Sequence, residues 1–103
     1  FNKIEKKKTK KKYAFIDFTA KWCLTCKVNE ALVLNTNSFK KLAQEYQMEL
    51  LLADWTKRDK NITDFLMAQG KVGVPAYFIL DKNGKLNDLG ETISIDEIQQ
   101  YLK

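Results

Sequence analysis

The chain has 103 residues, which fits a single domain, and its 45% hydrophobic and 12% aromatic residues are enough to build a buried core. No apolar run reaches the roughly 18–20 residues that a bilayer span requires. The formal net charge is +5, and the sequence contains no His, the commonest general base and metal ligand. Any chemistry that this protein performs therefore proceeds without imidazole.

The positive charge is concentrated at the amino end. Residues 1–12 hold seven Lys and one Glu (+6), whereas residues 13–103 hold 11 Lys or Arg and 12 Asp or Glu (−1). A basic segment can bind nucleic acid or an anionic membrane surface, but a solvated linker is the simpler interpretation. The sequence begins at Phe1 and shows no signal-peptide pattern. We therefore expect a Lys-rich linker over residues 1–12, which connects a domain over residues 13–103 to a longer precursor.

The first half of this domain predicts two buried strands separated by two helices. Residues 13–19 and 49–54 are short apolar runs, the first of them β-branched and aromatic, as is typical of buried strands. Residues 38–46 place their apolar side chains on one helical face. An earlier helix begins near the cysteines, because three apolar residues recur at helical spacing: Val28, Leu32 and Val33.

The second half predicts a helix, a hairpin and a final helix. Residues 61–69 carry a helical pattern that ends at a glycine. Strands over 76–80 and 85–89 flank the turn sequence Asp-Lys-Asn-Gly. Residues 94–97 form a capping box that opens a helix ending near residue 102. The early strand–helix–strand order favours parallel pairing, and the late hairpin adds antiparallel strands. We expect an α/β fold with a central mixed sheet flanked by helices.

Cys23 and Cys26 are the only cysteines, and their spacing allows four interpretations. A zinc site needs about four ligands, usually from two such pairs, and an iron–sulfur site has the same shortage of ligands. A structural disulfide across so short a loop constrains little chain entropy. A redox-active dithiol between a strand and a helix start fits best.

The helix start assigns different roles to the two thiols. Unpaired N–H groups and the helix dipole stabilise a thiolate at this end of a helix. We expect Cys23, at the outer edge, to be the nucleophile, and Cys26, one turn further in, to resolve the mixed disulfide. The intervening Leu24-Thr25 provides no imidazolium, so we expect a reducing couple.

Two carboxylates are candidates for moving the proton of the resolving thiol. Asp17 interrupts an apolar strand, where it is either exposed at a strand edge or buried at a cost in free energy. Glu30 follows Cys26 by four residues and shares its helix face, although an ordinary exposed Glu fits equally well. If either carboxylate is desolvated near Cys26, its pKa rises and it can exchange that proton.

Pro75, the only proline, directly precedes a predicted strand. Proline is acceptable at the first position of a strand. A cis Val74–Pro75 bond would instead expose the Val74 backbone for strand-like pairing with a substrate.

These motifs resemble the thioredoxin superfamily. The strand and helix start FIDFTAKWCLTCK and the loop VGVP resemble that family's buried acid, WCxxCK sequence and cis-proline loop. The resemblance implies a thioredoxin-like fold over the domain and a protein-disulfide oxidoreductase. It makes Asp17, Cys23 and Cys26 the catalytic residues, and the spacing of Glu30 from Cys26 adds Glu30 as a further catalytic candidate. It makes Trp22, Val74 and Pro75 the substrate-binding residues, with no cofactor other than the Cys23–Cys26 disulfide.

The chain departs from ordinary thioredoxin in three segments, and the last two of them, with Lys27 and Glu30, resemble the C-terminal domain of the DsbD family of thiol:disulfide interchange proteins. Leu24-Thr25 replaces Gly-Pro, residues 29–38 resemble an insertion, and residues 53–59 (ADWTKRD) replace the usual segment after the central strand. The resemblance implies a periplasmic domain of an inner-membrane protein, monomeric when isolated. It would pass electrons from a membrane-embedded domain to other domains of the same reductase, and onward to disulfide isomerases and cytochrome c maturation factors.

Two other functions remain open at this point. The chain could be a free-standing thioredoxin-like or cytochrome c maturation reductase. It could also be a binding module whose basic segment contacts nucleic acid or lipid, although we expect no nucleic-acid partner.

Overall fold

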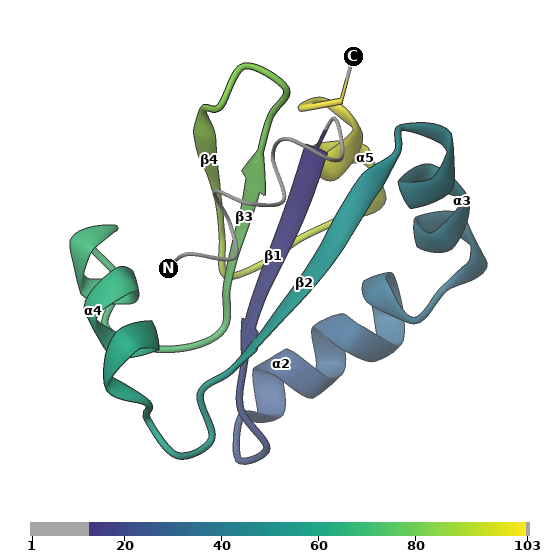
Figure 1. Cartoon of the computed structure of the whole chain (residues 1–103). Helices are drawn as coiled ribbons and strands as arrows, with labels where there is room; N and C mark the ends of the chain where they lie inside the picture. Colours follow the sequence, from purple (N-terminus) through teal and green to yellow (C-terminus); the bar gives the residue numbers. More distant parts are fainter. Residues whose placement is uncertain (1–12, 103) are drawn as a thin grey trace.

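The computed structural model describes residues 13–102, so the predicted linker over residues 1–12 lies outside the described part of the chain. Four strands form one sheet in the order β2-β1-β3-β4 (Figure 1). The strands are β1 (Tyr13–Thr19), β2 (Met48–Asp54), β3 (Ala76–Leu80) and β4 (Leu86–Gly90).

Helices cover both faces of this sheet (Figure 1). One face packs against α4 (Lys60–Ala68), and the other packs against the remaining helices. These are α2 (Leu24–Asn29), the π-helical segment η1 (Glu30–Leu34), α3 (Asn37–Glu45) and α5 (Ile95–Gln99). The structure confirms the expected α/β fold with a mixed sheet flanked by helices.

The strand pairing follows from the connections. β1 pairs in parallel with β2, which it reaches through helices, and antiparallel with β3. β3 and β4 are antiparallel and are joined by the turn predicted at residues 81–84, in which Gly84 N–H donates to the Asp81 carbonyl at 3.0 Å. The carboxyl end of β1 thus lies inside the sheet and leads directly into the cysteine pair.

The strand β1 is buried on both faces, and its alternation divides the core in two. Phe15 belongs to the cluster beneath α3 and α5, whereas Ile16 and Phe18 belong to the cluster beneath α4. Asp17 has the parity of Phe15, so its side chain lies on the sheet face that α2 covers.

The strand predicted over residues 49–54 is present as β2, but the prediction that it is buried is wrong. β2 is the outermost strand of the sheet formed by residues 13–102, and Leu50 and Leu52 are 50% and 68% exposed. The continuous apolar sequence suggested burial on both faces, but a strand with one described neighbour leaves part of one face uncovered.

The helix predicted after the cysteines is present, but the apolar residues that indicated it do not all face the core. Val28 is 47% exposed and Leu32 is 72% exposed. The buried positions are Cys26, Asn29 and Val33. The π-helical turn, closed by Asn35 N–H donating to the Glu30 carbonyl at 2.7 Å, rotates the following residues relative to α2. The segment 29–38 that looked like an insertion is therefore this π turn and the start of α3.

Candidate active site

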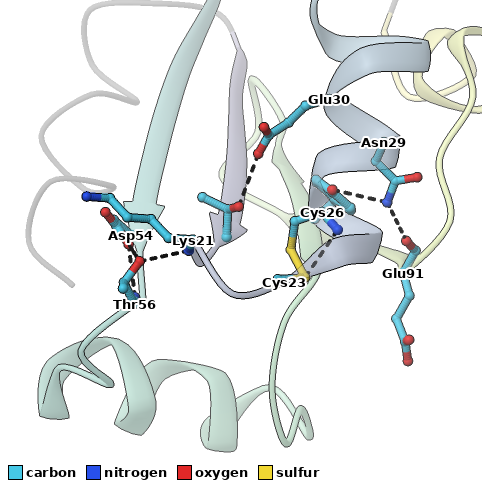
Figure 2. Close-up of a disulfide and its surroundings, with 10 residues drawn as sticks. Lys21, Cys23, Cys26, Asn29, Glu30, Asp54, Thr56 and Glu91 are labelled. Carbon is cyan, nitrogen blue, oxygen red and sulfur yellow. Dashed lines mark hydrogen bonds between the residues drawn. A yellow bond between two sulfur atoms is a disulfide. The ribbon is translucent and has the colours of Figure 1, made fainter.

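Cys23 and Cys26 form a disulfide where β1 gives way to α2 (Figure 2). A tight turn over residues 20–23 connects β1 to α2, and in it the Cys23 N–H donates to the Ala20 carbonyl at 3.1 Å. Cys23 then occupies the N-cap of α2, and its sulfur accepts a hydrogen bond from the Cys26 N–H at 3.1 Å. A backbone donor at a helix N-terminus therefore points at the sulfur on which a thiolate would form.

The two cysteines differ in exposure. Cys23 is 6% exposed, whereas Cys26 is completely buried. A partner can therefore approach the pair only from the Cys23 side, because the fold covers Cys26 completely.

The loop before β3 completes one wall around the disulfide. The Val74–Pro75 peptide bond is cis, and Val74 packs against the cluster formed by Ala20 and the two cysteines. Pro75 is buried, and Trp22, which directly precedes Cys23, is 49% exposed. Thus the three residues expected to bind substrate lie in segments next to the cysteines. Two of them, Val74 and Pro75, belong to the loop before β3, in which Val74 contacts the cysteine pair.

Asp17 lies within the sheet and not at an exposed edge. Its side chain is 9% exposed, and its Oδ1 atom has no hydrogen-bond partner. Burial, and to a lesser degree the negative charge of Glu30, raise the pKa of Asp17 from 3.8 to about 7. Asp17 also lines a cavity of about 160 Å³, which has apolar walls from η1, α3 and β2 that include Leu34, Phe39 and Leu52.

Glu30 is half-buried and points back to the end of β1. Its Oε2 accepts a hydrogen bond from the Thr19 hydroxyl at 3.1 Å (Figure 2). Asp17 and Thr19 are two residues apart on β1, so their side chains point to the same face of the sheet. Because Glu30 bonds to Thr19, the carboxylates of Asp17 and Glu30 both lie on the face that the cysteine helix covers. Among the hydrogen bonds of residues 13–102, neither carboxylate bonds to a sulfur in this disulfide form.

Asn29 is a buried polar residue that the sequence reasoning missed. Its side-chain amide donates to the Tyr77 hydroxyl at 3.2 Å and to the Glu91 carbonyl at 2.9 Å. It thereby connects the cysteine helix to β3 and to the segment after β4 (Figure 2). Its position three residues after Cys26 places it on the buried face of the helix, and that spacing was the available signal.

The segment after β2 contacts the turn that precedes Cys23, a position that the sequence did not predict for it. The Trp22 indole N–H donates to the Thr56 carbonyl at 3.0 Å. The Thr56 hydroxyl accepts from the Lys21 N–H at 2.9 Å (Figure 2). Thr56 in turn bonds to Asp54, and this lowers the pKa of the Asp54 carboxyl. Thr56 thus anchors the turn that precedes Cys23.

The described residues offer little for other chemistry. No group of three His, Cys, Asp or Glu side chains within residues 13–102 is placed to hold a metal ion. Within the same range, every helix falls short of the length and apolarity that a membrane crossing demands.

A mixed sheet that delivers a CxxC disulfide to a helix N-terminus, opposite a cis-proline loop, defines the thioredoxin-like class of thiol–disulfide oxidoreductases. A sequence model described as thioredoxin-like matches residues 2–82. The chain therefore belongs to the thioredoxin-like family, which confirms the resemblance seen in its motifs.

Solved structures agree with this assignment. The reduced C-terminal domain of DsbD from Neisseria meningitidis superposes with a TM-score of 0.75 at 23% identity, with 95% of this chain and 90% of that chain covered. The DsbH oxidoreductase gives a TM-score of 0.71 at 22% identity, with 96% and 78% covered. A thioredoxin variant from Halobacterium salinarum gives 0.70 at 16% identity, with 100% and 86% covered. A search of curated protein sequences finds no match.

Proposed function

We propose that this domain is a protein-disulfide reductase that relays electrons from a membrane-embedded donor to periplasmic partner proteins. The observation that carries the proposal is the Cys23–Cys26 disulfide at a helix N-terminus, with Cys23 6% exposed, Cys26 completely buried and a buried carboxylate of raised pKa beneath the helix. The fold that it shares with the DsbD C-terminal domain supports this choice among thioredoxin-like functions.

The first step is attack by the Cys23 thiolate on a disulfide of the partner. The Cys23–partner disulfide forms, the partner disulfide breaks, and the released partner sulfur takes a proton from water. The Cys26 N–H, which donates to the Cys23 sulfur, stabilises the negative charge before attack. Trp22, Val74 and Pro75 border the route along which the partner chain arrives.

The second step releases the partner. Cys26 gives its proton to Asp17, and the Cys26 thiolate attacks the Cys23 sulfur. The Cys23–Cys26 disulfide forms, and the second partner sulfur leaves and is protonated. The partner gains two electrons and two protons, and a donor dithiol then returns the domain to its reduced form. A pKa near 7 leaves Asp17 able both to accept and to release a proton at neutral pH.

The reducing direction is proposed from the chemistry around Cys23. The sequence has no His, so no imidazolium adds to the helix N-terminus in stabilising the thiolate. A less stabilised thiolate makes the reduced form a stronger reductant. We expect a potential nearer to the roughly −270 mV of thioredoxin than to the roughly −120 mV of the oxidant DsbA.

A trapping experiment tests the assignment of the two cysteines. Cys26→Ser should accumulate a mixed disulfide with a model protein disulfide through Cys23, because the resolving thiol is missing. Cys23→Ser should form almost none, since Cys26 is completely buried. Non-reducing gels with mass spectrometry read out the adduct, and equilibration with glutathione gives the wild-type potential.

Two outcomes would contradict the proposal. Trapping mainly through Cys26 would reverse the roles, and a potential near that of DsbA would reverse the direction.

A free-standing reductase is the second candidate, since the fold also superposes on a thioredoxin over 100% of this chain. The complete reading frame separates the two candidates, because the relay requires membrane-spanning segments in the same protein.

A further inference from the structure

Arg58 lies against two indole rings beside the nucleophilic cysteine. Its guanidinium carbon is 4.7 Å from the ring centroid of Trp22 and 5.4 Å from that of Trp55. The two rings are 5.9 Å apart, inclined at 55°. Trp22 directly precedes Cys23 and is half exposed. An exposed positive charge therefore lies at the rim of the redox site.

The loop holds the arginine in this position. The Arg58 N–H donates to the Trp55 carbonyl at 2.9 Å, and the backbone of Arg58 is left-handed, with φ of 54°. That conformation is unfavourable for a residue with a Cβ, so surrounding contacts must maintain it. Both indoles are themselves fixed, because Trp22 bonds to Thr56 and Trp55 donates to the Thr63 hydroxyl at 2.7 Å.

Arg58 has no carboxylate among its ion-pair or hydrogen-bond partners in residues 13–102. Lys71 forms an ion pair with Asp88 at 2.8 Å, and the positive charge of Lys21 acts on Asp54. Stacking uses the flat face of a guanidinium and leaves N–H donors at its edge. Those donors form a fork that matches a carboxylate.

We propose that Arg58 is a specificity-determining residue, which selects partner proteins that carry Asp or Glu next to the disulfide to be reduced. This inference rests on the proposed reductase function. A disulfide that reaches Cys23 must bring its flanking residues over Trp22, where the guanidinium fork is presented. The thiol–disulfide exchange itself is unchanged; the arginine adds an ion pair in the encounter and in the mixed disulfide.

A charge-swap experiment tests the proposal. Two disulfide peptides that differ only in a Glu or a Lys beside one cysteine are reduced by wild-type protein and by Arg58→Glu. Wild type should reduce the Glu peptide about five-fold faster, as expected for one exposed ion pair, and added salt should diminish the ratio. Arg58→Glu should invert the preference, and Arg58→Gln should abolish it.

The ratio between peptides isolates recognition from other effects. A changed Cys23 pKa or partial loss of stability alters both rates by the same factor and cancels. Lys57→Glu is the matched control, since Lys57 is an exposed neighbour of equal charge that does not contact the indoles. We expect it to shift the ratio by less than about two-fold.

The two hypotheses fail in distinguishable ways. Equal reduction of both peptides by wild type, or equal shifts in Lys57→Glu and Arg58→Glu, would overturn the role of Arg58 while leaving the reductase intact. Failure to reduce either peptide would overturn the reductase function and this inference with it.

Discussion

Asp17 shows how one buried carboxyl group can serve catalysis at a cost to the fold. Its Oδ1 has no hydrogen-bond partner, and burial raises its pKa to about 7. A protonated acid avoids the large cost of an unpaired buried charge, and the same property lets it exchange a proton near neutral pH. The chemical role and the energetic cost have the same origin.

Replacing Asp17 by Asn should slow the release of the partner. The amide keeps the shape of the side chain but cannot accept the Cys26 proton, so attack on the mixed disulfide should slow by about 10²-fold near pH 7. Formation of the mixed disulfide by Cys23 should change much less. Rapid-quench measurement of the mixed-disulfide lifetime separates the two steps.

The pH profile provides the decisive readout for this variant. The wild-type resolving rate should rise as Asp17 ionises through about pH 7, and Asp17→Asn should lose that inflection. The exposed Asp64 of α4 is the matched control, and Asp64→Asn should keep it. An inflection retained in Asp17→Asn would assign the proton transfer to another group.

At the scale of elements, the cysteine helix is held in place by polar as well as apolar contacts. Asn29 bonds to Tyr77 of β3 and to the backbone after β4, and both partners lie far from it in sequence. The Tyr77 hydroxyl is buried, and desolvation raises its pKa to about 12, so it remains a neutral partner. These bonds set the orientation of α2, and with it the depth of Cys26.

Asn29→Ala should therefore destabilise the domain by about 2–3 kcal/mol, because it removes two hydrogen bonds and leaves buried polar groups without partners. Urea unfolding of the oxidised protein measures the loss. The control is Asn35→Ala, at an exposed position just after η1, which should cost less than about 1 kcal/mol. Equal losses in the two variants would show that the Asn29 network contributes little.

At the scale of the whole molecule, Asp17 couples stability to pH. Its pKa is 3.8 in the unfolded reference and about 7 in the folded protein. Between these pH values the unfolded chain has released a proton that the folded protein keeps, so rising pH favours unfolding. The loss begins near pH 4, is complete above about pH 7, and corresponds to up to about 4 kcal/mol.

Asp17→Asn should remove this loss. The variant and wild type should have similar free energies of unfolding near pH 4, and the variant should be more stable by a few kcal/mol at pH 8. Denaturant unfolding of the oxidised proteins from pH 4 to 9 measures the difference. The exposed carboxylate variant Glu45→Gln should follow wild type throughout. A constant difference between Asp17→Asn and wild type would contradict the raised pKa.

Local sequence determined the elements and the reactive pair. The apolar run over residues 13–19, the turn at 81–84 and the capping box at Ser94, whose hydroxyl accepts from the Glu97 N–H at 3.2 Å, are short-range signals. They act within a few residues, so they can be read without the fold. The cysteine spacing predicted the dithiol for the same reason, and its roles in exchange remain predictions.

Only the tertiary structure decided what surrounds that pair. The exposure of β2, the exposure of Val28 and Leu32 on the cysteine helix, and the stacking of Arg58 on Trp22 depend on segments far apart in sequence. Burial and charge contacts are sums over such neighbours, so the pKa of Asp17 follows from the fold and not from its place in a strand. The sequence alone therefore predicted a CxxC pair without His and a candidate acid at Asp17; the fold decided that this acid is buried and placed the Arg58 cation beside Trp22.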